Sequence, residues 1–210
     1  MADLKIKRRV VSACSTNCYY VFREGADEIV IIDPGADGSI IFDDVKSLGF
    51  SKVGAILLTH GHGDHTGGAK ELQRLTGAKI FALEQEAEIL KDPKKNLSGW
   101  FGDSYGWEAD EYLRDGDEIT FAGVDFKVIH TPGHTIGGCC YYSEADKVCF
   151  CGDTIFNGSV GRTDFATGSM SDLAHSIREK ILTLPGETKL YTGHGDKTTV
   201  EYESKYNPCL

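Results

Sequence analysis

The sequence predicts an α/β (α+β) sandwich in which two β-sheets pack face to face and helices cover their outer faces. Strand-like runs come before and after amphipathic helical runs in both halves of the chain. In each half these strands end at loops that contain glycine and carry histidine or aspartate. No linker-like segment divides residues 1–210, so we expect one domain over the whole chain.

The first half of the chain alternates between strands and helices. Short runs rich in β-branched and aromatic residues predict strands, and apolar residues three or four apart predict helices. Gly49 and Gly77 follow two of the helical runs and should end them. The expected strands span residues 6–11, 18–23, 28–33, 53–58 and 79–83, and the expected helices span 40–48, 66–76 and 84–91.

The second half begins with a stretch that has no clear period. Residues 92–116 combine several glycines with aromatic residues that include Trp100 and Phe101. Such a segment either covers a ligand site or packs as a surface loop. Regular patterns then resume and predict strands at 118–121, 125–130, 138–142, 147–151 and 189–192, with a helix at 171–184.

Charge and cysteine content restrict the class of protein. The formal net charge of -10 argues against a nucleic-acid partner, because phosphate binding needs clustered Lys and Arg. The basic run 5–9 precedes no apolar core, so we do not expect it to act as a signal peptide. No run approaches the roughly 18 apolar residues of a membrane span. The odd count of 7 cysteines favours reduced thiols, and we expect a soluble cytoplasmic protein.

A dense group of metal-binding side chains follows the apolar run 55–58. His60, His62, Asp64 and His65 lie within six successive positions, and imidazole and carboxylate bind divalent zinc, iron and manganese. On an extended segment His60 and His62 face the same side, whereas Asp64 and His65 turn towards a second position. A single histidine is usually an ordinary hydrogen-bonded residue, but this density predicts half of a two-metal site.

Three further candidate ligands lie in the second half, each just after a predicted strand. They are His134, Asp153 and His194. Each is weak evidence alone, since a Gly-Asp pair, for example, is usually a turn. Together with the first group they form an ordered series at strand ends, HxHxDH, then His, then Asp, then His. This series predicts one cage of seven ligands.

The ordered series resembles the metallo-β-lactamase superfamily over essentially the whole chain. The resemblance implies a four-layer αββα sandwich, which agrees with the order of the predicted elements. It also implies a metal-dependent hydrolase with two divalent ions, zinc being expected first and iron or manganese being the alternatives. In that arrangement His60, His62 and His134 bind the first metal, Asp64, His65 and His194 bind the second, and Asp153 bridges both.

Three residues near the cage have other expected roles. By the same resemblance, Asp33 supports the histidine cluster from behind, and the alternative is a simple turn-starting Asp before Pro34. His130 is expected to support the cage or to be structural, without binding metal. His175, in the middle of a predicted helix with polar neighbours, is expected on the surface.

The segment 153–164 looks like glyoxalase II and its short relatives, the hydroxyacylglutathione hydrolase-like enzymes. In those enzymes a cation at the position of Arg162 binds a carboxylate of the glutathione portion, and a structural pair between Arg162 and Asp164 is the alternative. Full glyoxalase II carries a further helical domain after the last histidine ligand, whereas 16 residues follow His194. We therefore expect no C-terminal glutathione-binding helical domain.

The resemblance implies a thioesterase that cleaves an anionic small-molecule thioester such as S-lactoylglutathione. Two divalent ions would lower the pKa of a bound water from about 15.7 towards neutrality, and the resulting hydroxide would attack the thioester carbonyl. Asp64 and Asp153 are the catalytic candidates, because they fix the metals and orient the nucleophile. Arg162 and Phe156 are the substrate-binding candidates, and Trp100 is a further candidate for the pocket wall, together with its neighbour Phe101.

Other members of the superfamily provide alternative functions. A persulfide dioxygenase would hold a single iron at the positions of His60, His134 and Asp153, the two-histidine, one-carboxylate set of non-haem iron oxygenases. A hydrolase of another ester, a lactone or an amide, including a β-lactam, fits the same cage. A non-catalytic metal-binding protein is a third alternative. The complete set of second-metal ligands favours hydrolysis.

Overall fold

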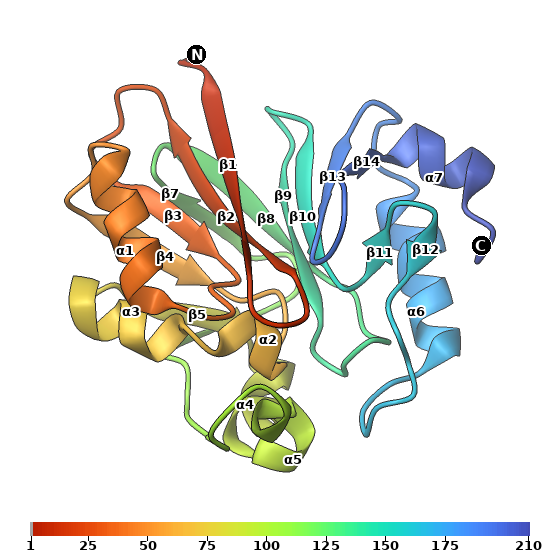
Figure 1. Ribbon diagram of the computed structural model, residues 1–210. Coiled ribbons are helices and arrows are strands. Elements are labelled where there is room, and N and C mark those ends of the chain that lie inside the picture. Colours follow the sequence, from red (N-terminus) through yellow and green to blue (C-terminus); the bar gives the residue numbers. More distant parts are fainter. Residues whose placement is uncertain (1) are drawn as a thin grey trace.

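Two sheets of six strands face one another at the centre of the protein (Figure 1). The structure, a computed structural model, describes residues 2–210. The first sheet contains, in spatial order, β1 (Leu4–Val11), β2 (Thr16–Arg23), β3 (Ile29–Ile32), β4 (Val53–Leu57), β5 (Ile80–Leu83) and β6 (Glu111–Leu113). The second contains β14 (Thr198–Thr199), β13 (Lys189–Thr192), β10 (Val148–Gly152), β9 (Cys139–Ser143), β8 (Val124–His130) and β7 (Glu118–Phe121).

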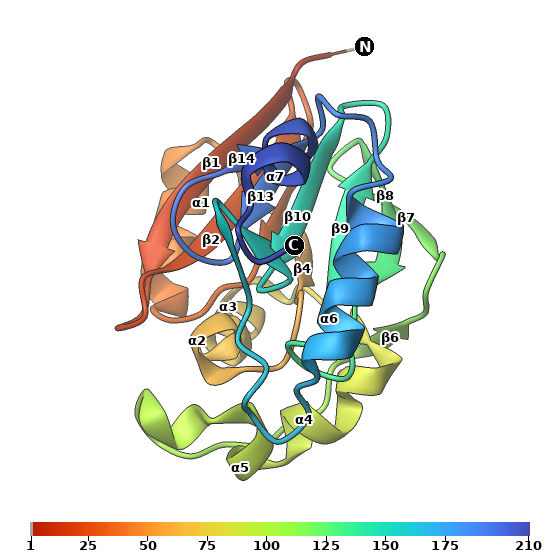
Figure 2. The ribbon, with the colours of Figure 1, turned by 90° about the vertical axis from the view of Figure 1, so that its right-hand side faces the viewer.

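The helical segments are α1 (Gly38–Ser47), α2 (Gly63–Thr66), α3 (Ala69–Thr76), η1 (Glu84–Glu86), α4 (Ala87–Lys91), α5 (Pro93–Asn96), η2 (Ser98–Trp100), α6 (Met170–Ser176), η3 (Ile177–Ile181) and α7 (Val200–Tyr206). Helices α1 and α3 lie on the outer side of the first sheet, and α6 and α7 lie on the other side of the molecule (Figures 1 and 2). Within residues 2–210, no helix has the length and apolar character that crossing a membrane requires.

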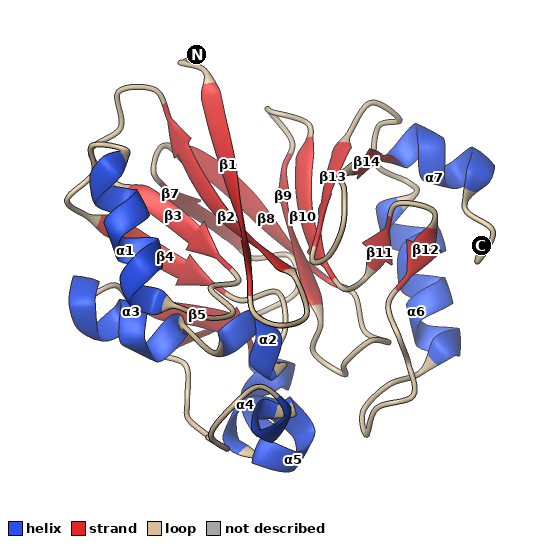
Figure 3. Ribbon diagram, viewed as in Figure 1, coloured by secondary structure: helices blue, strands red, loops and turns tan. Residues whose placement is uncertain are grey.

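Figure 3 shows helices outside two layers of strands. The alternation of side chains along the strands explains these layers. In β3, Val30 and Ile32 belong to the apolar layer between the two sheets. Ile29 and Ile31 point the other way and pack with residues of α1 and α3. The second sheet alternates in the same manner, because one face joins the central layer and the other packs against α6. Helix, sheet, sheet and helix therefore follow one another, and the predicted αββα sandwich is confirmed.

Two predicted helices are interrupted in the structure. The run expected as one helix over 66–76 is divided into α2 and α3 by Gly67 and Gly68. A Cβ at Gly68 would lie 2.6 Å from the carbonyl oxygen of Ala36, so this close backbone approach requires glycine and ends the first turn. The helix expected over 171–184 is α6 followed by the π-helical turn η3, which ends at Ile181.

Several short elements were absent from the sequence prediction. The aperiodic stretch 92–116 contains α5, η2 and β6, and β6 pairs in parallel with β5. A two-stranded ribbon of β11 (Ile155–Phe156) and β12 (Ser159–Val160) lies beyond the second sheet. The helix α7 near the C-terminus was also missed. Except for α7, these elements have two to four residues and show no hydrophobic period, which is why the sequence pattern did not indicate them.

Candidate metal centre

The seven predicted ligand residues meet at one edge of the sandwich. Strands β3 and β4 of the first sheet are parallel, as are β10 and β13 of the second, so the loops that follow β4, β10 and β13 emerge together. Their ligand atoms form three overlapping groups, each within 4.8 Å: His60 with His62 and His134, His60 with His65 and Asp153, and Asp64 with His65 and His194.

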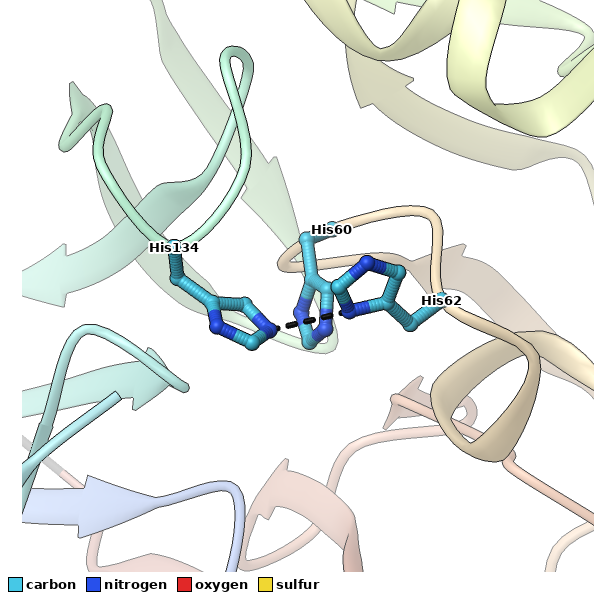
Figure 4. A group of neighbouring side chains, drawn as sticks. All are labelled: His60, His62 and His134. Carbon is cyan, nitrogen blue, oxygen red and sulfur yellow. Dashed lines mark hydrogen bonds between the residues drawn. The ribbon is translucent and has the colours of Figure 1, made fainter. Parts of the chain in front are cut away.

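His60, His62 and His134 form the first cluster, here called the three-histidine group (Figure 4). All three are buried. His60 and His62 come from the loop after β4, and His134 comes from the loop between β8 and β9 in the other sheet. The Nδ1 atom of His62 lies 2.9 Å from the Nε2 atom of His134. Two ring nitrogens at this distance share a proton or face a common cation.

Asp64, His65 and His194 form the second cluster, here called the aspartate–histidine group. The Nε2 atoms of His65 and His194 are 3.4 Å apart, close to the ~3.3 Å expected between two nitrogens on one tetrahedral zinc ion. An oxygen of Asp64 lies 3.4 Å from the Nε2 atom of His194. The group therefore has the donor types and the spacing that a second divalent ion accepts.

Asp153 lies between the two groups. Its Oδ2 atom is 3.5 Å from the Nε2 atom of His134 and 3.4 Å from that of His194. Its Oδ1 atom is 3.3 Å from the Nε2 atom of His65 but accepts no hydrogen bond. A Cβ at Gly193 would lie 2.1 Å from this Oδ1 atom, so only glycine leaves room for the carboxylate at this position. One carboxylate thus reaches histidines of both groups.

Hydrogen bonds to the far side of the imidazoles select their tautomers. His65 Nδ1 donates to Asp33 (2.9 Å), His134 Nδ1 donates to the carbonyl of Arg162 (2.7 Å), and His194 Nδ1 donates to the carbonyl of Cys14 (3.1 Å). When neutral, each of these rings presents the lone pair of its Nε2 to the centre of the site.

The residues fit a pair of bound metal ions. The Nε2 atom of His60 is buried without a hydrogen-bond partner, as is the Oδ1 atom of Asp153. Buried polar atoms are nearly always paired, and both of these atoms point into the cluster of donors. Imidazole nitrogens and carboxylate oxygens are the ligands that zinc, iron and manganese share. The seven residues could therefore hold two divalent ions, one in each group.

The two groups differ in their titration. Burial, followed by the neighbouring histidines, lowers the pKa of His62 to about 3 and that of His60 well below its usual value. Burial also acts to lower the pKa of His194, but hydrogen bonds to Asp153 and Asp64 outweigh it and raise that pKa to about 10. Burial likewise acts to lower the pKa of His65, but the charges of Asp153, Asp64 and Asp33 together outweigh it and raise that pKa.

Asp33 supports the cluster from behind, as the sequence predicted. Its carboxylate accepts the backbone N–H of Thr59 (2.8 Å), the Thr59 hydroxyl (2.6 Å) and His65 Nδ1–H. The hydroxyl oxygen of Thr59 in turn lies 3.2 Å from Nδ1 of His60. Asp33 has a φ of 52°, a left-handed conformation that non-glycine residues adopt at a cost. The surrounding hydrogen bonds hold this strained residue in place.

The predicted substrate-binding residues surround the cluster. The ring of Phe156 packs edge-on against His194, with centroids 5.8 Å apart. The Arg162 side chain is 62% exposed and forms two hydrogen bonds with Asp164, at 3.0 and 2.8 Å. Trp100 is 66% exposed, and Phe101 is partly buried beside Gly63.

Some residues at the site were not anticipated. The ring of Phe165 packs against the rings of His62 and Trp100, with centroids 5.3 and 5.8 Å apart. The guanidinium carbon of Arg162 lies 4.5 Å from the centroid of the Phe165 ring. The buried carboxylate of Glu86 binds the loops that carry the three-histidine group. Thr16 donates a hydrogen bond to Asp64 (3.0 Å). No local pattern in the sequence distinguishes these residues.

Two histidines lie outside the cluster, as expected. His130 is the last residue of β8, and its Nε2 atom hydrogen-bonds with the carbonyl of Ile136 (2.9 Å). His175 lies on α6 and is exposed.

Comparison with known proteins agrees with this geometry. The family described as the Metallo-beta-lactamase superfamily matches residues 11–194. The hydroxyacylglutathione hydrolase GloC of Haemophilus influenzae is 32% identical over 206 residues, which cover 95% of each chain. The crystal structure of BLEG-1 B3 metallo-beta-lactamase superposes with a TM-score of 0.90 at 34% identity, over 97% of this chain and 98% of that chain. The crystal structure of TTHA1623 in a di-iron-bound form gives a TM-score of 0.86 at 28% identity, over 97% and 100% of the two chains.

Proposed function

The chain belongs to the metallo-β-lactamase superfamily, and from this membership we propose that it is a binuclear, glyoxalase II-like thioesterase. Its proposed substrate is an anionic thioester such as S-lactoylglutathione. One observation carries the binuclear part: Asp153 reaches histidines of the three-histidine group and of the aspartate–histidine group, all within 3.5 Å. A site for a single metal ion would need only one of the two groups.

In the proposed hydrolysis, bound metal ions and side chains of the protein have different roles. When bound, two divalent ions lower the pKa of a water molecule and polarise the substrate carbonyl. In the reaction the water oxygen bonds to the acyl carbon, the carbon–sulfur bond breaks, and the sulfur leaves with the electron pair as a thiolate. The proton that the water loses ends on this sulfur, so a carboxylic acid and a thiol are the products. Asp153 and Asp64 are the proposed catalytic residues. The Oδ1 atom of Asp153, which accepts no hydrogen bond from the protein, is available to orient the attacking water.

Arg162 and Phe156 are the proposed substrate contacts. The guanidinium of Arg162 is exposed but already bound by Asp164, so a substrate carboxylate would have to join or displace that partner. The ring of Phe156 covers His194 and would form an apolar wall beside the acyl group. The GloC relative supports a glutathione thioester as the first substrate to test.

Metal analysis combined with a thioester assay tests the proposal. We expect freshly purified protein to contain two divalent ions per chain and to release thiol from S-lactoylglutathione. Asp153→Asn should abolish this release, and His175→Asn, a change at an exposed residue away from the cluster, should preserve it.

Three results would overturn the proposal in different ways. One iron per chain with oxygen uptake on a persulfide substrate would indicate a persulfide dioxygenase. Two metal ions per chain with cleavage of a lactone or a β-lactam, but not of the thioester, would leave the binuclear hydrolase and exclude the thioesterase. Full thioesterase activity in Asp153→Asn would exclude the assigned site.

A further inference from the structure

The carboxylate of Glu86 is a buried charge that the proposed chemistry does not use. Glu86 is the last residue of η1 and is 1% exposed. Its hydrogen-bond donors are two backbone N–H groups and one hydroxyl, so none of them is charged. Burial raises the pKa of Glu86 to about 7, against the hydrogen bonds that lower it. A carboxylate is costly to bury in such surroundings, which suggests that its position matters.

The donors come from two loops that are distant in the sequence. The N–H of Gly61 donates to Oε2 of Glu86 (2.7 Å). The hydroxyl of Thr135 (2.6 Å) and the N–H of Gly137 (2.9 Å) donate to Oε1. Each carboxylate oxygen therefore binds a different loop. One loop follows β4 in the first sheet, and the other joins β8 to β9 in the second.

These two loops carry the whole three-histidine group. Gly61 lies between His60 and His62, and Thr135 directly follows His134. The 2.9 Å distance between Nδ1 of His62 and Nε2 of His134 therefore depends on how the loops are placed relative to one another. Figure 4 shows the rings of the two loops converging on the same point.

Close packing makes the connection specific. A Cβ at Gly61 would lie 2.8 Å from Oε2 of Glu86, and a Cβ at Gly137 would lie 2.5 Å from the backbone nitrogen of Glu86. Each loop thus has a glycine, Gly61 or Gly137, whose backbone lies against Glu86 with no room for a side chain. A side chain of another length or polarity would change the separation of the loops or leave buried N–H groups without an acceptor.

We propose that Glu86 is a positioning residue for the first metal: by joining the two loops it sets the spacing of the three-histidine group. This inference rests on the proposed function for the presence of two metal ions but not for the identity of the substrate. The aspartate–histidine group has a further support, because Asp33 binds His65 directly and reaches His60 only through Thr59. Loss of Glu86 should therefore weaken one metal position and not the other.

The protein contains a matched control for the burial of a carboxylate. Glu203 in α7 is also 1% exposed. It accepts hydrogen bonds from the N–H of Gly158 (3.1 Å), the amide of Asn207 (2.7 Å) and the hydroxyl of Thr198. None of these partners is adjacent to a ligand residue. Glu203→Gln therefore removes a similar buried charge without altering the loops of the metal centre.

The test is a titration of metal-free protein with Co²⁺, followed by the absorption of the bound ion and by competition with a chromophoric chelator. We expect two binding steps in the wild type. Glu86→Gln should weaken one step ~10–100-fold, as for other partners that orient metal ligands, and change the spectrum of that ion. The other step should change by less than about threefold, and Glu203→Gln should leave both steps and both spectra unchanged.

Three outcomes would overturn the proposal: unchanged steps in folded Glu86→Gln, an equal loss in both steps, or the same loss in Glu203→Gln. Because Glu86→Gln can fail to fold, Thr135→Val provides a milder variant that removes one hydrogen bond. It should weaken the same step in the same direction, and an unchanged Thr135→Val would also contradict the proposal. Since no substrate is present, failure of this test is distinct from failure of the thioesterase assay.

Discussion

The two halves of the metal centre, the three-histidine group and the aspartate–histidine group, have different electrostatic surroundings. The three-histidine group lies buried on the two loops that Glu86 joins, and burial lowers the pKa of His62 to about 3. The aspartate–histidine group is surrounded by carboxylates, and hydrogen bonds to Asp153 and Asp64 outweigh burial and raise the pKa of His194 to about 10. When metal is absent, burial therefore keeps His60 and His62 uncharged, whereas nearby carboxylates hold a proton on His65 and His194.

This difference has a consequence for how metal enters. At neutral pH His60 and His62 have no charge to lose before they bind a metal ion. The aspartate–histidine group holds protons, which a divalent ion must displace before it can bind. Asp153 couples the halves, since its two oxygens contact His65 on one side and His134 on the other.

The largest effect is expected from removing the residue common to both halves. Asp153→Asn replaces a carboxylate oxygen that faces both groups with an amide. Metal ions contribute several kcal/mol to hydrolysis, so we expect a loss of ~10³-fold or more in kcat/KM. Metal content per chain should fall in parallel, as measured by elemental analysis. A variant that keeps both metals and its activity would show that Asp153 does not couple the two halves.

The next effect concerns the pH dependence of stability on the three-histidine side. The folded-state pKa of Glu86 is raised from 4.5 to about 7, so the folded protein binds this proton more tightly than the unfolded chain. Protonation of Glu86 therefore stabilises the folded state. This contribution to the free energy of unfolding is complete below pH 4.5 and is lost as the pH rises through about 7. It amounts to about 3 kcal/mol, since each pKa unit corresponds to about 1.4 kcal/mol.

Denaturant unfolding of the metal-free protein at pH 4.5 and pH 8 measures this effect. The glutamine side chain of Glu86→Gln does not titrate. Between pH 4.5 and pH 8 the wild type should therefore lose about 3 kcal/mol of unfolding free energy relative to this variant. Bound divalent ions should reduce the shift, because nearby positive charge favours the carboxylate. A difference that is independent of pH would contradict the raised pKa.

The aspartate–histidine side has its own positioning residue to test. Asp33→Asn places an amide where His65 Nδ1–H needs an acceptor. We expect ~10–100-fold weaker binding of one Co²⁺ ion, and this should be the ion that Glu86→Gln leaves unaffected. Asp37→Asn is the matched control, because Asp37 has the same left-handed backbone but is exposed. If both variants weakened the same binding step, the division into two halves would be wrong.

The sequence indicated the ligands better than it indicated their supports. His60, His62 and His65 are visible because they are dense in a short segment, and the later ligands follow strong strand patterns. Asp33 could also be anticipated at a strand end. In each case a local pattern placed a polar residue where parallel strands converge. The seven side chains come together as the pattern predicted, and their individual roles remain predictions.

The missed residues act through tertiary contacts that no local pattern encodes. Glu86 lies between Glu84 and Glu88, where it resembles the solvated charges of a short helix. Its partners are 25, 49 and 51 residues away in the sequence. Phe165 likewise gains its position from contacts with His62 and Arg162. The division of the predicted helix 66–76 has the same origin, since Gly68 packs against the backbone of Ala36.

The smallest expected effect concerns Arg162, at the border of the three-histidine side. Its carbonyl orients His134, while its side chain is paired with Asp164. If the guanidinium binds a substrate carboxylate, Arg162→Gln should raise KM about three- to tenfold with kcat unchanged, because a solvent-exposed charged contact contributes little to binding. Asp164→Asn should lower KM by freeing the guanidinium. An unchanged KM in both variants would mean that the pair is structural, and that only the backbone of Arg162 serves the metal centre.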